Sequence, residues 1–118
     1  MAKKKLIYSF QVAFQGLISI AKKERNLKIH LSIFSLVCLA GIYFSITKFE
    51  WLTILMISAL VISLEIVNTA IEKLCDFCEP NHNEKIKIIK DTAAAAILVA
   101  AAIAICIGLI VFVPHIFW

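Results

Sequence analysis

Three long apolar stretches dominate the chain, and each is long enough to cross a lipid bilayer. They cover residues 29–47, 51–72 and 92–117, and a membrane-spanning helix needs roughly 20 mainly apolar residues. The second stretch differs from the others because its last part contains Glu65 and Asn68. This pattern predicts an all-α membrane protein with three transmembrane helices, folded as a single domain over residues 1–118.

The segment before the first apolar stretch predicts a different kind of helix. Between residues 6 and 26, apolar side chains recur at helical spacing, and serines and glutamines separate them. Such a pattern is typical of an amphipathic helix that lies in the membrane interface. A cleaved signal peptide is the alternative, but polar residues interrupt the apolar run and a basic cluster follows it directly. We therefore expect a surface helix over residues 6–26.

The basic residues predict how the chain is oriented. The sequence is 62% hydrophobic, has a formal net charge of +4 and contains twelve Lys and Arg residues. Eleven of them precede the first span or lie at or between the second and third, and only Lys48 lies on the other side. Because basic residues favour the cytoplasm, we expect an inner (plasma) membrane protein with a cytoplasmic N-terminus and Trp118 outside. Attraction to lipid headgroups accounts for the net charge, without nucleic acid.

A polar stripe runs along the second span. At 100° per residue, Glu65, Glu72 and Asp76 fall at about 0°, −20° and +20° around the helix, and Asn68 falls at about −60°. Glu65 also lies about 21 Å along the helix from Trp51, which places it below the cytoplasmic surface. An ionisable group at such depth costs about 2.5 to 3.5 kcal/mol and usually has a function.

Two interpretations of the stripe compete. Asn68 and Glu65 could belong to a hydrogen-bonded network that joins the helices, but several carboxylates on one face also need a counter-charge. The candidates are Lys90, Lys23 or Arg25, and a divalent cation. An oxygen-rich cluster suits Mg²⁺, which binds one or two carboxylates together with substrate phosphates. The residues therefore predict a cytoplasmic-side site for a metal, a phosphate or a proton.

The four cysteines carry a weaker signal. Cys38 and Cys106 lie within spans, where a small apolar role suffices. Cys75 and Cys78, with His82 nearby, have part of the spacing of a zinc site, but a structural zinc ion needs four ligands and a second pair is missing. We therefore expect neither metal nor redox use of these cysteines.

Several motifs together resemble the bacterial diacylglycerol kinase and undecaprenol kinase family, over nearly the whole chain. In the second span the pattern is Glu65-x-x-Asn68-Thr-Ala-Ile-Glu72-x-x-x-Asp76, and Lys90-Asp91-x-Ala-Ala-Ala follows after thirteen residues. Nearer the N-terminus the matching patterns are Ser9-Phe10-x-x-Ala13-x-x-Gly16 and Glu24-x-Asn26-x-x-Ile29-His30. Where the Gram-negative diacylglycerol kinases tend to show Gly-Ser after the Lys-Asp pair, this chain has Thr92 and four alanines, which favours the undecaprenol kinase branch.

The resemblance implies a homotrimeric membrane kinase that transfers the γ-phosphate of ATP to undecaprenol or diacylglycerol. It implies that Glu24 and Glu72 hold Mg²⁺ and that Glu65 is the catalytic base. The residues that it implies for the nucleotide and phosphate site are Asn68, Asp76, Lys90 and Asp91. With only three glycines and no phosphate-binding glycine loop in the chain, the expectation of ATP rests on this resemblance.

Two other functions remain as alternatives. The first is a small ion- or proton-coupled transporter subunit, in which Glu65 and Glu72 would relay the ion. Such a relay should continue across the bilayer, and we expect no ionisable groups in the outer half of the second span or in the other two spans. The second is a non-catalytic membrane assembly partner, which leaves Glu24, Lys90 and Asp91 without a purpose.

Overall fold

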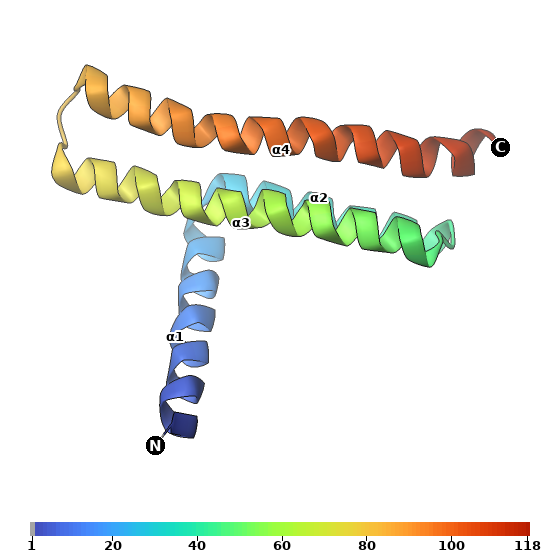
Figure 1. The fold of residues 1–118 in the computed structure, drawn as a ribbon, viewed down its shortest axis with the longest axis horizontal. Helices are drawn as coiled ribbons and strands as arrows, with labels where there is room; N and C mark the ends of the chain where they lie inside the picture. Colours follow the sequence, from blue (N-terminus) through green and yellow to red (C-terminus); the bar gives the residue numbers. More distant parts are fainter. Residues whose placement is uncertain (1) are drawn as a thin grey trace.

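The structure, a computed structural model, describes residues 2–118 as four helices. The helices are α1 (Ala2–Lys23), α2 (Arg25–Tyr43), α3 (Lys48–Cys78) and α4 (Glu84–Phe117). In Figure 1, α2, α3 and α4 form an elongated bundle and α1 projects away from it. α3 is the central helix, since it packs against both α2 and α4. No strand occurs within residues 2–118, so the prediction of an all-α fold is confirmed.

The three bundle helices are long and apolar enough to cross a membrane. Most of their surface is exposed in the single chain, and large apolar side chains cover it. This is the surface expected of a protein that faces lipid or neighbouring membrane helices. The predicted class of membrane protein is therefore confirmed. The trimer and the membrane boundaries within each helix stay predictions.

The helices extend beyond the apolar stretches because polar residues cap their ends. Thr47 and Glu50 form a reciprocal capping box, in which Thr47 Oγ1 accepts from the Glu50 amide at 3.1 Å and Glu50 Oε1 accepts from the Thr47 amide at 2.9 Å. Asn83 Oδ1 likewise accepts from the Lys85 amide at 2.9 Å. α3 and α4 therefore begin before residues 51 and 92, where their apolar stretches begin.

A short break separates α1 from α2 at Glu24. Its backbone is extended, with φ −94° and ψ 117°, and its side chain makes no capping hydrogen bond. The predicted surface helix over residues 6–26 therefore ends slightly early, at Lys23. The Glu24 carboxylate is therefore not used to cap a helix, and Glu24 lies where the chain turns into the bundle.

The best-packed part of the bundle lies around the turn between α2 and α3. Ile46, Ile54 and Val111 form a buried cluster there. His115 Nε2 of α4 lies 3.2 Å from Glu50 Oε1 of α3, which joins these two helices at the same end. We call this the turn end, and the opposite end, which carries the α3–α4 connection at residues 79–83, the hairpin end.

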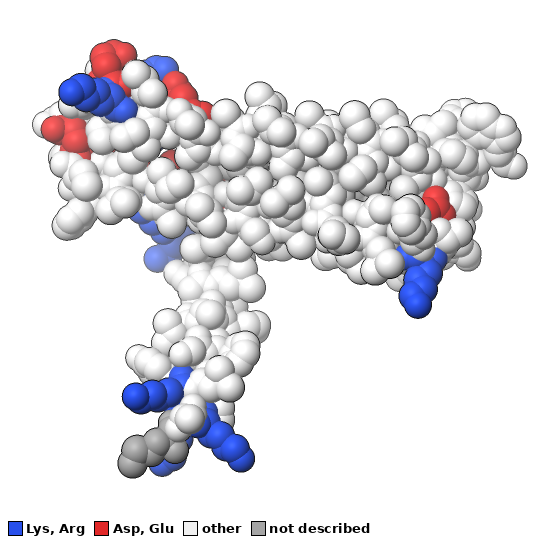
Figure 2. Space-filling model, in the orientation of Figure 1, with Lys and Arg blue, Asp and Glu red and all other residues white. Residues whose placement is uncertain are grey.

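Charged side chains are distributed unevenly along the bundle. Figure 2 shows a long uncharged middle, a mixture of acidic and basic side chains at the hairpin end, further basic side chains on α1, and a smaller patch of basic and acidic side chains at the turn end. The prediction that the hairpin end faces the cytoplasm rests on the bias of basic residues toward that side, and it stays a prediction.

The contact between Gly41 and Trp51 gives a prediction about stability. A Cβ atom added at Gly41 would lie 2.7 Å from Trp51 Cη2 and 3.1 Å from Ile46 Cδ1. We expect Gly41→Ala to destabilise the protein by about 1–3 kcal/mol, the usual cost of overpacking, measured by reversible unfolding in detergent. Gly16→Ala is the matched control, because nothing lies within 4 Å of its added Cβ. Equal stability of the two variants would contradict the importance of this contact.

Candidate active site

The polar stripe of α3 passes from buried to exposed as it approaches the hairpin end. Glu65 and Asn68 are 3% and 5% exposed, Glu72 is half-buried and Asp76 is exposed. Thr69 Oγ1 donates to the Glu65 carbonyl at 3.0 Å, one turn back along the same helix. The predicted stripe therefore leads from the bundle interior to its polar end.

Asn68 connects the inner part of the stripe to the outer part. Its Nδ2 donates to Glu72 Oε1 at 3.1 Å. The amide must present its NH₂ group to this partner, because an ionised carboxylate only accepts hydrogen bonds. Within residues 2–118, Asn68 Oδ1 is consequently left buried without a partner, and it is free to accept from a donor or to bind a cation.

His30 of α2 approaches the deepest carboxylate of the stripe. His30 Nε2 lies 3.5 Å from Glu65 Oε2, and the two side chains are 23% and 4% exposed. The contact connects α2 to α3 beside the stripe. The spacing along the chain did not predict this contact, although a histidine at the start of an apolar stretch was a usable signal.

The expectation that the other two spans lack ionisable groups is wrong. His30 lies within the first predicted span and His115 within the third. His115 pairs with Glu50 at the turn end, and His30 lies beside Glu65. Each histidine thus has a carboxylate partner on α3.

The outer part of the stripe contacts the first turns of α4. Lys90 Nζ donates to Asp76 Oδ1 at 2.5 Å, so the expectation that Lys90 supplies a counter-charge is confirmed for Asp76. Asp91 instead accepts from Lys87 Nζ at 2.6 Å on its own helix. The neighbouring residues Lys90 and Asp91 thus pair with different partners.

A polar pocket of about 350 Å³ opens at the hairpin end. Three of the four residues expected at the nucleotide site line it, namely Asp76, Lys90 and Asp91. Residues 79–83, Ile86 and Lys87 complete its lining. Asn68, the fourth expected residue, lies deeper along α3 and does not line the pocket.

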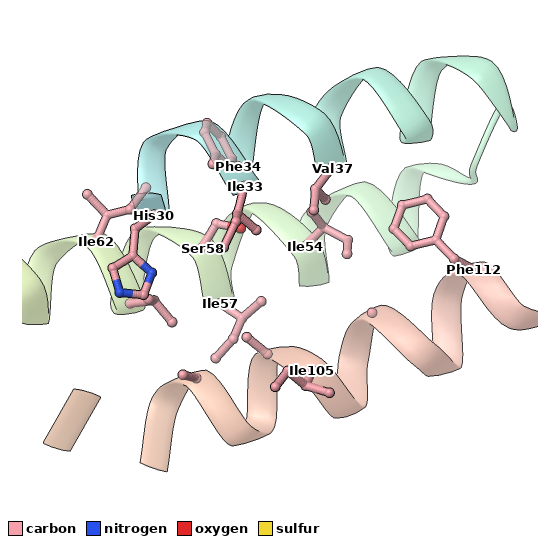
Figure 3. A pocket seen from close by; sticks show the side chains of 14 residues that line it. His30, Ile33, Phe34, Val37, Ile54, Ile57, Ser58, Ile62, Ile105 and Phe112 are labelled. Atoms are coloured by element: carbon pink, nitrogen blue, oxygen red, sulfur yellow. The ribbon is translucent and has the colours of Figure 1, made fainter. Parts of the chain in front are cut away.

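A second cavity, also of about 350 Å³, lies between α2, α3 and α4. Its lining is apolar except for His30 and Ser58. Figure 3 shows His30 of α2 at one end of this cavity and Phe112 of α4 at the other. On α3 the lining reaches Val61 and Ile62, and Glu65 follows one helical turn later.

The expected metal ligands are Glu24, at the break between α1 and α2, and Glu72, on α3. Glu24 Oε1 lies 4.0 Å from Nζ of Lys73, the residue next to Glu72. No group of three His, Cys, Asp or Glu side chains within residues 2–118 is arranged to hold a metal ion, and this includes Cys75, Cys78 and His82. Carboxylate oxygens are the kind of ligand that Mg²⁺ prefers, and Glu24 and Glu72 stay predicted metal ligands.

Taken together, three apolar helices and a carboxylate-rich site at one end define an integral membrane protein with a polar site next to an apolar cavity. The family model for prokaryotic diacylglycerol kinase matches residues 11–112. The chain therefore belongs to the prokaryotic diacylglycerol kinase family, and it is a membrane lipid kinase.

Two curated relatives support this assignment. The undecaprenol kinase of Bacillus subtilis (strain 168) is 36% identical over 106 residues, which cover 90% of this chain and 86% of the relative. The diacylglycerol kinase of Synechocystis sp. is 32% identical over 110 residues, which cover 92% of this chain and 63% of that longer protein.

The Lys90–Asp76 pair gives a prediction about its contribution to stability. Both side chains are partly open to solvent, at 35% and 66% exposure, so their coupling energy should be no more than about 1 kcal/mol. A double-mutant cycle with Lys90→Met and Asp76→Asn, read by unfolding in detergent, measures it. A coupling above about 2 kcal/mol, well beyond the range of exposed pairs, would show that the pair is mainly structural.

Proposed function

We propose that this protein transfers the γ-phosphate of ATP, bound with Mg²⁺, to the hydroxyl group of undecaprenol or diacylglycerol. The observation that carries the proposal is the position of Glu65 along α3. This buried carboxylate lies between the apolar cavity, whose lining ends one turn before it, and the polar pocket that begins at Asp76. A base in that position can serve a lipid on one side and a nucleotide on the other.

The apolar cavity is the proposed place for the hydrocarbon chain of the acceptor. Its lining of aliphatic and aromatic side chains suits an alkyl or isoprenyl chain. A lipid lying there with its head toward the hairpin end would bring its hydroxyl group to Glu65. The depth of Glu65, below the polar end of the bundle, matches the place of a hydroxyl close to the headgroup region.

The polar pocket is the proposed place for the nucleotide. Lys90 would exchange Asp76 for a phosphate oxygen when ATP binds, because a lysine ammonium is a mobile point charge that suits phosphate. Asp76 and Asp91 would then contact polar groups of the nucleotide. Asn68, which lies deeper along α3 than the pocket, would contact the phosphate groups. This chain has no glycine-rich phosphate loop, so charged side chains must supply most of the recognition.

Glu24 and Glu72 are the proposed magnesium ligands. They would hold Mg²⁺, which when bound would supply positive charge to neutralise the phosphates. The protein must bring Glu24, at the α1–α2 break, and Glu72, on α3, to the same ion. Asn68 holds the Glu72 carboxylate in place by its 3.1 Å hydrogen bond.

In the proposed reaction Glu65 accepts the proton of the lipid hydroxyl as its oxygen attacks the γ-phosphorus. The new P–O bond forms while the bond to the β-phosphate oxygen breaks, and ADP leaves with that electron pair. The products are the lipid phosphate, ADP and one proton held by Glu65. Phosphoryl transfer depends mainly on positioning and charge neutralisation, which this set of residues can provide.

Between the two acceptors, we favour undecaprenol. The relative named undecaprenol kinase shares more identity with this chain and is covered over more of its length than the relative named diacylglycerol kinase. Thr92 and the four alanines that follow the Lys90-Asp91 pair, where the Gram-negative diacylglycerol kinases tend to show Gly-Ser, point the same way.

We also propose a homotrimer in the inner (plasma) membrane, with the N-terminus and the hairpin end in the cytoplasm. Eleven of the twelve basic residues support that orientation. The exposed apolar faces of α2 and α4 leave surface for neighbouring copies as well as for lipid. α1, which has exposed apolar side chains and no buried residue, would lie in the cytoplasmic interface.

The transporter alternative is less well supported. His30 and His115 add ionisable groups to the spans, but α3 has none between Glu50 and Glu65. That gap is about 22 Å long at 1.5 Å per residue, too far for a proton to pass without intervening groups. The ionisable groups therefore form two separate sites at opposite ends of the bundle.

The direct test is transfer of labelled γ-phosphate from ATP to undecaprenol and to diacylglycerol, measured side by side in mixed micelles with and without Mg²⁺. We expect Mg²⁺-dependent transfer, with undecaprenol phosphorylated faster. Folded protein that phosphorylates neither lipid would contradict the proposal and would make ion flux the next assay.

Replacement of the proposed base gives the first mutational prediction. Glu65→Gln should keep the fold and nucleotide binding but lower kcat by about 10²- to 10⁴-fold, the usual contribution of a general base. Glu50→Gln makes the same change on the same helix at the turn end, and turnover per folded molecule should stay at the wild-type level. Wild-type turnover in Glu65→Gln would remove Glu65 from the role of base.

Replacement of a proposed metal ligand should have a different signature. Glu72→Ala should raise the Mg²⁺ concentration needed for half-maximal rate and weaken nucleotide binding in parallel, because the ion and the phosphates bind together. Glu84→Ala, which removes an exposed carboxylate at the start of α4, is the control. An unchanged Mg²⁺ titration in Glu72→Ala would refute the assignment.

A further inference from the structure

We propose that His30 is the positioning residue for Glu65, an inference that rests on the proposed function. His30 Nε2–H would donate a hydrogen bond to Glu65 Oε2 and so direct Oε1 toward the acceptor hydroxyl. Among residues 2–118, His30 is the one basic side chain within 4.0 Å of the Glu65 carboxylate. The deepest acidic group of the bundle thus has a single basic partner, which comes from another helix.

The geometry of the pair suits a positioning role. At 3.5 Å the two atoms are slightly farther apart than in a direct hydrogen bond. Catalytic hydrogen bonds are often long without substrate and shorten in the reactive complex. A small rotation of either side chain would close this gap, and packing of α2 against α3 keeps them opposite one another.

The chemistry of the two groups explains what the contact would do. A carboxylate has two equivalent oxygens, and a buried carboxylate without a donor has no preferred orientation toward its substrate. A donor on Oε2 fixes the side chain and leaves Oε1 as the oxygen that receives the proton.

The position of His30 relates this role to the lipid. His30 lines the end of the apolar cavity (Figure 3) and also touches Glu65. A hydroxyl group that leaves the cavity toward Glu65 would therefore pass His30. With the imidazole on one carboxylate oxygen, the acceptor can reach only the other. His30 thus restricts how the lipid hydroxyl approaches the base.

The experiment compares His30→Leu and His30→Gln, each in the wild-type and the Glu65→Gln background, with the labelled transfer assay. Leu removes the donor and keeps an apolar side chain, whereas the Gln amide supplies an N–H near the position of Nε2. His115→Leu is the matched control, because His115 also lies beside a carboxylate of α3, but at the turn end and outside both pockets. Helical content and nucleotide binding report folding in each variant.

In the wild-type background we expect His30→Leu to lower kcat about 10- to 100-fold, the effect of losing one hydrogen bond to a charged group. The KM for ATP should not change. His30→Gln should recover most of the rate, and His115→Leu should match the wild type in turnover per folded molecule. In the Glu65→Gln background, His30→Leu should cause no further loss, because a residue that acts through Glu65 has nothing left to position.

Three results would overturn the inference. They are wild-type kcat in His30→Leu, an equal fold loss from His30→Leu with and without Glu65, and a folded His30→Gln as slow as His30→Leu. Failure of the proposed function itself looks different, because the wild-type protein would then phosphorylate neither lipid. If the wild type is active and His30→Leu has the same kcat, only the proposed role of His30 is excluded.

Discussion

The burial of one carboxylate inside a membrane bundle is the constraint on which the site depends. Glu65 is 3% exposed on the central helix, where an ionisable side chain costs about 2.5 to 3.5 kcal/mol or more in lipid. The surroundings have to reduce that cost, and α2 does so by placing His30 beside it. Farther along α3 the polar side chains become more exposed, so the cost of burying each of them is smaller and its neighbours have less to offset.

The two ends of the bundle have different tasks as a result. At the turn end, Gly41 permits close contact with Trp51, and Glu50 both caps α3 and pairs with His115. These contacts fix the helices relative to one another. The hairpin end instead holds a polar pocket lined by charged side chains, two of which, Lys90 and Asp76, pair between α4 and α3. Packing at one end can therefore keep His30 and Glu65 opposite each other while the other end binds and releases substrates.

The sequence predicted much of this arrangement because hydrophobic length and helical spacing are local properties. The apolar stretches gave three long helices, and the 100° rotation per residue placed Glu65, Asn68 and Glu72 on one face. The helix limits were less predictable, since Thr47 and Asn83 extend α3 and α4 into polar sequence by capping them. Glu24 was recognised by its place in a motif, but its position at a helix break was not foreseen.

Contacts between helices could not be read from the spacing along one helix. The approach of His30 to Glu65 depends on how α2 packs on α3. The pairing of Lys90 and Asp91 with different partners depends on how α4 is rotated about its axis. The free Asn68 Oδ1 becomes visible only once the partner of Nδ2 is known. Residue types thus indicated which chemistry was available, and packing decided which groups meet.

The most direct test of this account is the ionisation state of Glu65 with nucleotide bound. Infrared difference spectra of the wild type against Glu65→Gln, recorded in lipid at neutral pH with Mg²⁺ and a non-hydrolysable ATP analogue, isolate the bands of this side chain. We expect the paired stretching bands of a carboxylate, since a general base must be unprotonated before the hydroxyl group arrives. The single carbonyl band of a protonated carboxylic acid would contradict it.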